Sequence, residues 1–172
     1  MKKILGTIIL LGLVGCGEPL MPEEYSSLVL GTSEFEVRKE MGLPYRPISD
    51  DGEYKVFKKT LEQDPLFEGI LLSFRQGRLD DLAFIVKQSR CSRDLYHGLV
   101  RAMTEKLGCK AKFEKQGEAH QADWTSCLEG RPSPSPTSIY LVHQDQGGCM
   151  TVLRYVTERS EDWTPAGERV DL

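Results

Sequence analysis

The positions of the five cysteines constrain the fold of this 172-residue chain more than any other feature. Cys16 stands alone after an N-terminal apolar run, whereas Cys91, Cys109, Cys127 and Cys149 are spread through the second half. Four cysteines can pair completely, and disulfides are typical of exported proteins. We therefore expect two disulfides that cross-link the second half of the fold. A cysteine nucleophile is not expected, because pairing uses all four thiols.

Three pairings of these four cysteines are formally possible. Cys91 and Cys109 flank a predicted helix of about 17 residues, which would hold them about 25 Å apart. A disulfide needs Cα atoms within about 7 Å, so an intact helix excludes this pair. Of the two remaining pairings we favour Cys109–Cys127 with Cys91–Cys149, because the chain between Cys109 and Cys127 could form a hairpin that returns Cys127 to the helix end. The pairing of Cys91 with Cys127 and of Cys109 with Cys149 stays open.

The N-terminus has the pattern of an export signal. Lys2 and Lys3 precede a mostly apolar run over residues 4–14. Eleven helical residues span about 16 Å, roughly half a bilayer core, so this run predicts a signal peptide rather than a membrane span. The next motif, Leu13-Val14-Gly15-Cys16, resembles a bacterial lipobox. That resemblance implies removal of residues 1–15 and acylation of Cys16, and an ordinary signal peptide with a chance cysteine is the alternative.

A lipidated Cys16 would fix the location of the protein. Each buried CH₂ contributes about 0.8 kcal/mol, so several acyl chains make a stable membrane anchor. The residue after the cysteine is Gly17, not the Asp associated with inner-membrane retention in enterobacteria, so we expect the periplasmic face of the outer membrane rather than the inner membrane. Residues 16–27, with two prolines and no apolar periodicity, are predicted to form a lipidated tether.

The charge balance excludes one class of partner. The whole chain carries 22 Lys+Arg against 26 Asp+Glu, a formal net charge of -4. Removal of residues 1–15 takes away Lys2 and Lys3 and no acid, which changes the net charge from -4 to -6. A nucleic-acid binder held by a broad basic surface is therefore excluded. We expect the membrane and another envelope protein as partners.

The body of the chain predicts an α+β fold built from two units of one helix and three strands. In the first unit, residues 28–88, Ser33 and Glu36 form a capping-box pattern and Gly42 suits the helix end. In the second unit, residues 89–158, an apolar face repeats at helical spacing from Tyr96 to Leu107. The expected strands cover residues 54–58, 69–75, 79–86, 122–127, 138–143 and 150–156.

Neither unit can bury both faces of its own sheet. We therefore expect both helices on one face of an antiparallel sheet, either continuous or paired. Residues 159–172 are predicted to form a flexible tail. Trp163 in this tail is a candidate exposed binding anchor, and a satellite contact with the body is the alternative.

Two motifs in the first unit resemble a known lipoprotein family. The pattern Gly31-x-Ser33-x-x-Glu36-Val37 followed by Gly42-x-Pro44 is similar to the opening helix of the SmpA/OmlA (BamE-like) outer-membrane lipoproteins. Phe74-x-x-Gly77-x-Leu79 is similar to that family's second hairpin. The resemblance implies a role in outer-membrane assembly or stability. The tandem arrangement with disulfides is similar to the β-lactamase-inhibitor-protein fold, which implies a protein-binding surface.

The sequence contains no recognisable catalytic or metal-binding motif. It has no CxxC, GxSxG, HExxH or P-loop pattern, and His97, His120 and His143 are scattered without ligand spacing. His120 and His143 could face one another across strands, which we interpret as a surface feature. We therefore expect no enzyme, no cofactor and no metal. The expected function is a lipid-anchored, non-catalytic protein-binding module, and a periplasmic inhibitor or immunity lipoprotein that blocks a hydrolase is the alternative.

The lipobox interpretation predicts that Cys16→Ser abolishes acylation. Without the thiol there is no attachment point for the lipid, so the variant should leave the membrane fraction and carry no labelled palmitate. Metabolic labelling and membrane fractionation measure both effects. A variant that stays acylated and membrane-bound would contradict the interpretation.

Overall fold

The computed structural model of the protein describes residues 25, 28–130, 136–145 and 148–157. The predicted signal peptide (1–15), the predicted acylation site Cys16 and Trp163 in the predicted tail (159–172) lie outside these residues. Within the described ranges, no helix is both long enough and apolar enough to cross a bilayer.

The first helix, α1 (Glu34–Met41), is held at both ends by the residues that the sequence indicated. The Ser33 hydroxyl accepts a hydrogen bond from the Glu36 backbone N–H. At the other end Gly42 adopts the left-handed conformation, and its N–H donates to the Arg38 carbonyl. Both caps satisfy backbone groups that a helix leaves unpaired at its ends. The prediction of this short helix is confirmed.

The second helix, α2 (Arg93–Leu107), has the same kinds of caps. The Ser92 hydroxyl accepts from the Leu95 backbone N–H, and Gly108 is left-handed and donates to the Thr104 carbonyl. Tyr96 and Met103, seven residues apart, are buried on one side of the helix. This helix is also confirmed.

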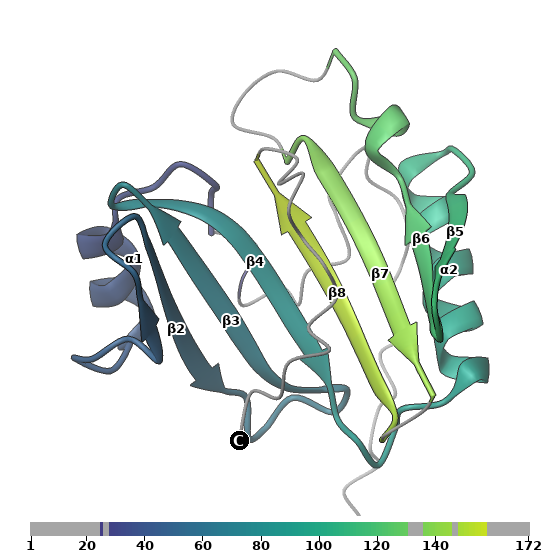
Figure 1. Ribbon diagram of the computed structural model, residues 1–172, viewed down its shortest axis with the longest axis horizontal. Coiled ribbons are helices and arrows are strands. Elements are labelled where there is room, and N and C mark those ends of the chain that lie inside the picture. The colour runs from purple at the N-terminus through teal and green to yellow at the C-terminus, as the bar shows by residue number, and fades with distance from the viewer. Residues whose placement is uncertain (1–24, 26–27, 131–135, 146–147, 158–172) are drawn as a thin grey trace, which may run out of the picture.

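All the described strands belong to one antiparallel sheet of eight strands, in the order β1-β2-β3-β4-β8-β7-β6-β5. Figure 1 shows α1 beside β2 at one end of the sheet and α2 beside β5 and β6 at the other. The strands are β1 (Ser49–Asp50), β2 (Tyr54–Thr60), β3 (Phe67–Arg75), β4 (Arg78–Val86), β5 (Lys112–Gln116), β6 (Ala119–Asp123), β7 (Ser138–Gln144) and β8 (Met150–Val156).

The predicted fold of two helix-plus-three-strand units is therefore wrong. Four strands follow each helix, and all eight strands join in a single sheet. The expected strands do not include β1 and β5. These two strands are the edges of the sheet, where one side of the strand is unpaired and few apolar residues are needed. The strand expected at 122–127 also ends early, because Thr125–Cys127 forms a 3-10 turn.

One face of the sheet forms the hydrophobic core. A row of buried register partners crosses five strands, and each residue in it faces the same way: Phe57, Leu72, Leu82, Tyr155 and Ile139. Buried side chains of α1 and α2 belong to the same core cluster as this row. Both helices thus cover this face, and a single core extends across the six inner strands from β2 to β6.

Tyr25 also belongs to this core. Its side chain is buried, and its ring lies 5.9 Å from the ring of Phe84 on β4. Leu28 and Leu30, which follow it, are buried in the same cluster. The folded body therefore extends to Tyr25, within the segment expected to be tether.

The structure pairs Cys91 with Cys149 and Cys109 with Cys127, with Cα separations of 5.8 Å and 6.1 Å. These separations are normal for disulfides. The first bond ties the start of α2 to the start of β8, and the second ties the end of α2 to the turn after β6. The structure thus contains the favoured pairing, with both bonds in the C-terminal half.

The opposite face of the sheet carries an ion pair at its centre. Arg154 on β8 donates from Nε to a carboxylate oxygen of Asp81 on β4, over 2.7 Å, and its Nη2 contacts the same oxygen. Asp81 is almost fully buried, and this burial raises the pKa of its carboxyl group while Arg154 acts in the opposite direction. The Asp81–Arg154 pair therefore links β4 to β8, the two strands at which the N-terminal and C-terminal parts of the sheet meet.

The described core predicts that two Phe→Ala substitutions lower the free energy of unfolding by very different amounts. Phe84 is fully buried against Tyr25, Phe67 and Tyr155, whereas Phe113 on the edge strand β5 is 62% exposed. Phe84→Ala should lower the free energy of unfolding by about 3–5 kcal/mol, because it leaves a cavity. Phe113→Ala should change it by less than about 0.5 kcal/mol. Urea unfolding followed by circular dichroism tests this, and equal losses would contradict the described core.

Candidate functional site

Large apolar side chains project into solvent beside α1. Phe35 is 77% exposed and Tyr45, in the loop after the helix, is 86% exposed. Together with Arg38, Lys39 and the half-buried Leu43, these residues make what we call the α1 surface. Ile48, further along the same loop, is 56% exposed as well.

The exposure of Phe35 follows from the geometry of α1. Val37 and Met41 lie four residues apart and point into the core. Phe35 is two residues before Val37, which places it about 200° around the helix, on the solvent side. A shallow depression is lined by Glu34, Phe35, Arg38, Lys39 and Leu43. The helix thus buries its apolar side without Phe35, and the exposed ring is free to contact another molecule.

Arg38 holds the loop that carries Tyr45. Its guanidinium donates to the Tyr45 carbonyl over 3.2 Å and lies 5.6 Å from the centre of the Tyr45 ring. It also lies over the ring of buried Phe57 and forms an ion pair with Glu34. Contacts with four groups restrict Arg38, so the position of Tyr45 is largely set before any partner binds.

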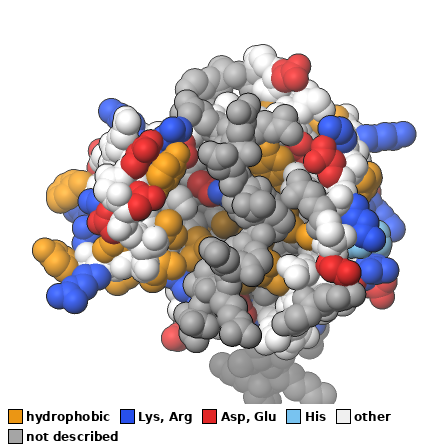
Figure 2. Space-filling view, in the orientation of Figure 1, with side chains coloured by type: hydrophobic (Ala, Val, Ile, Leu, Met, Phe, Trp, Pro, Cys, Tyr) orange, Lys and Arg blue, Asp and Glu red, His pale blue; other side chains and the backbone are white. Residues whose placement is uncertain are grey.

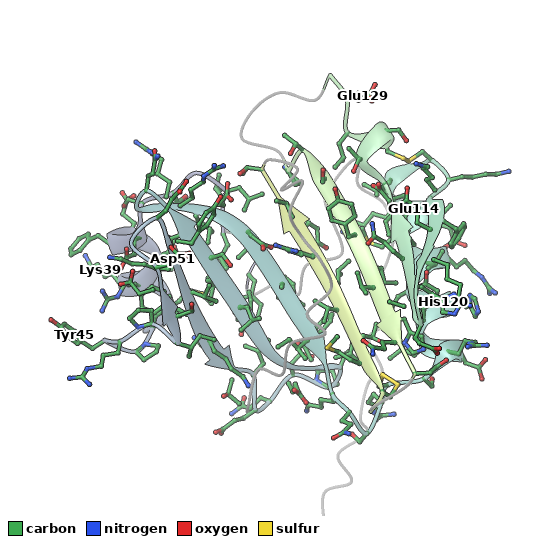
Figure 3. All side chains as sticks on the ribbon, viewed as in Figure 1. Lys39, Tyr45, Asp51, Glu114, His120 and Glu129 are labelled. Carbon is green, nitrogen blue, oxygen red and sulfur yellow. A yellow bond between two sulfur atoms is a disulfide. The ribbon has the colours of Figure 1, made fainter. Side chains whose placement is uncertain are left out.

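Basic side chains border the apolar ones. Figure 2 shows orange and blue side chains projecting next to one another at the left edge of the molecule, where Figure 1 places α1. Figure 3 shows Lys39 and Tyr45 pointing away from the body on this edge. Arg46, next to Tyr45 in the chain, is exposed too. The α1 surface therefore combines aromatic anchors with positive charge.

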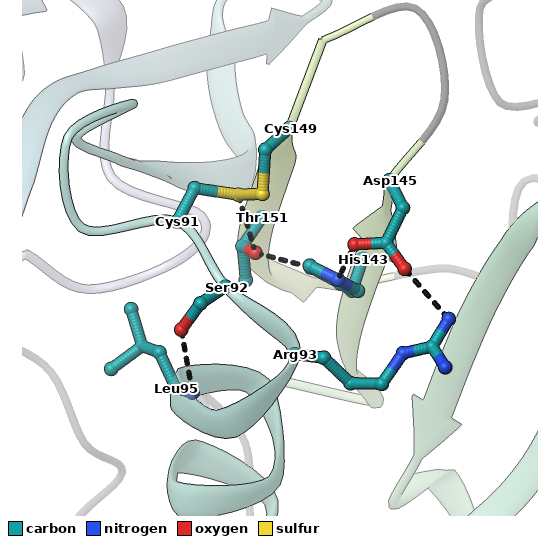
Figure 4. A network of polar contacts seen from close by, with 8 residues as sticks. All are labelled: Cys91, Ser92, Arg93, Leu95, His143, Asp145, Cys149 and Thr151. Carbon is teal, nitrogen blue, oxygen red and sulfur yellow. Dashed lines mark hydrogen bonds and ion pairs between the residues drawn. A yellow bond between two sulfur atoms is a disulfide. The ribbon is translucent and has the colours of Figure 1, made fainter.

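A second cluster of functional groups lies at the start of α2, against the Cys91–Cys149 disulfide (Figure 4). His143 on β7 contacts the Thr151 hydroxyl through Nδ1 and the Asp145 carboxylate through Nε2, both over 2.8 Å. The Thr151 hydroxyl is also 3.3 Å from Cys91 Sγ. A continuous chain of polar contacts thus connects the disulfide with Asp145.

The imidazole ring of His143 is fixed by burial as well as by these bonds. The side chain is fully buried, and the Tyr96 ring of α2 stacks on it at 5.3 Å between centres and 26° between planes. The carboxylate of Asp145 can only accept, so Nε2 carries a proton. In the neutral ring this leaves the lone pair of Nδ1 directed toward Thr151.

Asp145 anchors the outer end of this network. It accepts from Arg93, the first residue of α2, over 2.7 Å, and from His143. These hydrogen bonds, the one from Arg93 first, hold the pKa of the Asp145 carboxyl below its ordinary value. The carboxylate is therefore ionised at neutral pH and orients the ring beside it.

The sequence predicted parts of this cluster but not their association. His120 and His143 are register partners on β6 and β7, as expected, but His143 is fully buried and is not the surface feature we expected. Within the described part of the chain, Cys91, His143 and Cys149 form a group whose possible ligand atoms all lie within 4.8 Å of one another. Ligand spacing could not indicate it, since 52 residues of sequence separate Cys91 from His143. Trp124, directly after β6, is fully buried in the core.

Comparison with known proteins leaves the family open. No protein-family model matches the sequence, and searches of curated proteins and of solved structures gave no match. The similarity to the SmpA/OmlA lipoproteins therefore rests on the quoted motifs alone.

The lowered pKa of Asp145 predicts a pH-dependent effect of Asp145→Asn. A carboxylate whose pKa is lowered by folding stabilises the protein above its unfolded pKa, near 3.9, and loses this effect as the pH falls through the folded value. The urea midpoint of the variant should thus lie below that of the wild type at pH 5, and the two should converge toward pH 3. Glu62→Gln, at an exposed position, is the control and should leave the midpoint unchanged. A difference in urea midpoint between wild type and Asp145→Asn that stays constant with pH would contradict the lowered pKa of Asp145.

Proposed function

We propose that the protein is a lipid-anchored, non-catalytic binding module that docks onto another envelope protein through the α1 surface. The observation that carries this proposal is the exposure of Phe35 and Tyr45 on adjoining segments, which leaves two large rings in water. Exposed aromatic side chains with a polar border are typical of protein-binding sites. Tyrosine and arginine are also among the residues that contribute most to binding energy.

The rigidity of the surface supports a binding role. A loop that must be ordered on binding reduces the affinity, because it loses conformational entropy. Here Gly42 ends the helix, Arg38 fixes the Tyr45 backbone, and the Ile48 backbone N–H donates to Val56 on β2 over 2.8 Å. The loop is thus attached at both ends, and docking requires little further ordering.

The border of the surface favours a partner with an apolar pocket and charged residues around it. Arg38, Lys39 and Arg46 lie beside Phe35 and Tyr45, and the same helix carries Glu34, Glu36 and Glu40. A partner whose charges complement both signs would therefore be held in one orientation on α1.

An anchor at Cys16 would keep this surface near the membrane. Tyr25 is part of the core, so the free chain between Cys16 and Tyr25 can extend by at most about 30 Å. Proteins embedded in the same membrane or attached to it would lie within this reach. A role in outer-membrane assembly or stability, as the SmpA/OmlA resemblance implies, agrees with this location.

The proposal predicts that one protein binds the wild type but not the Phe35→Ala/Tyr45→Ala variant. Each truncated anchor should cost about 2 kcal/mol or more, so capture should fall at least about tenfold. Affinity purification from detergent-solubilised membranes with quantitative mass spectrometry measures it. Phe113→Ala is the matched control, since it removes an exposed ring from the far edge of the sheet.

The outcomes separate the parts of the proposal. Equal capture by both variants would place the binding site elsewhere, and no specific capture by the wild type would overturn the binding role. Recovery of outer-membrane assembly subunits supports the assembly role. A hydrolase recovered in their place would replace assembly with inhibition.

A further inference from the structure

The Cys91–Cys149 disulfide differs from the Cys109–Cys127 disulfide in what surrounds it. Cys91 and Cys149 lie against the buried imidazole of His143, and their sulfur atoms and a ring nitrogen are within 4.8 Å of one another (Figure 4). Among the described residues, Cys109 and Cys127 belong to no such group. The Cys91–Cys149 disulfide therefore lies beside a histidine that could act as a metal ligand, and the Cys109–Cys127 disulfide does not.

We propose that reduction of the Cys91–Cys149 disulfide creates a zinc site formed by Cys91, Cys149 and His143. Two thiolates and one imidazole are a standard donor set for Zn²⁺, and three protein ligands leave one position for water. The same two sulfur atoms cannot serve in a disulfide and as thiolate ligands. The site is therefore present only in the reduced protein.

The distances fit a tetrahedral zinc ion. Zn–S bonds of about 2.3 Å and Zn–N bonds of about 2.1 Å place the ligand atoms roughly 3.5–3.8 Å apart. The three ligand atoms already lie within 4.8 Å, and the Cα atoms of Cys91 and Cys149 are 5.8 Å apart. Opening the disulfide and rotating the two side chains would complete the geometry without moving a strand.

The surroundings of His143 resemble the second shell of a metal site. Zinc-bound histidines almost always donate their other ring N–H to a carboxylate or carbonyl oxygen, which fixes the ring and makes it a better ligand. His143 donates from Nε2 to Asp145, which Arg93 holds in turn. The stacked ring of Tyr96 prevents the imidazole from turning away.

The reduction step needs a dithiol as co-reactant. The dithiol attacks the disulfide through a mixed disulfide and is oxidised to its own disulfide, and Cys91 and Cys149 take up two electrons and two protons. Zinc then displaces both thiol protons to solvent and accepts the lone pair of His143 Nδ1. The Thr151 hydroxyl, 2.8 Å from Nδ1, gives up its hydrogen bond to the ring.

Zinc titration of the reduced protein tests the proposal. The purified full-length lipoprotein in detergent is reduced with dithiothreitol, desalted without oxygen, and titrated with Zn²⁺ against a chromophoric chelator. One Zn²⁺ per chain should bind after reduction, and none at this site before it. Cys109→Ser/Cys127→Ser should keep the site, and Cys91→Ser/Cys149→Ser should lose it.

Two further variants separate a metal site from a packing network. His143→Ala should weaken Zn²⁺ binding at least tenfold, and Asp145→Asn should weaken it about 10–100-fold through the second shell. Co²⁺ in place of Zn²⁺ should give a thiolate-to-metal charge-transfer band in the reduced wild type. Reduced wild type that binds no more Zn²⁺ than Cys91→Ser/Cys149→Ser would overturn the proposal, and so would unchanged affinity in His143→Ala. If reduction alone lowers the circular dichroism signal, Zn²⁺ should restore it, and failure to do so would count against the site.

Discussion

The pairing of β4 with β8 is the interaction on which the rest of the structure depends. Residues 81–85 of β4 pair with residues 152–156 of β8, and among the described strands this ladder alone joins the N-terminal strands to the C-terminal strands. Leu82 and Phe84 face Tyr155 and Leu153 across it, so the core continues from one half to the other. Without this ladder each half would be a four-stranded sheet with one helix and an open edge.

Much of the local structure could be predicted from the sequence, because it depends on neighbouring residues. Ser33 and Ser92 begin helices and Gly42 and Gly108 end them, as capping chemistry indicates. The turn between β3 and β4 is local as well. Its two residues, Gln76 and Gly77, both adopt positive φ, as a two-residue hairpin turn requires. These features need no knowledge of the rest of the fold.

The features that depend on distant residues could not be predicted in the same way. Nothing near β4 in the sequence indicates that it pairs with β8, whose residues come much later in the chain. The burial of His143 depends on Tyr96, Thr151 and Asp145, and only the last is a near neighbour in the chain. The exposure of Phe35, by contrast, could have been predicted, because Phe35 lies two residues before the buried Val37 and therefore on the opposite side of the helix.

The order of strands in the sheet also has a consequence for how the protein folds. β8 is the last of the described strands, yet it pairs with β4 from the first half. A chain that emerges from its N-terminus completes β4 long before β8 exists, so the edge carrying Leu82, Phe84 and Ile85 stays open in the interval. Contacts between residues so far apart form slowly, because a long loop must close first. The step that completes the sheet is thus the latest one, and until then an apolar strand edge is available for aggregation or for a chaperone.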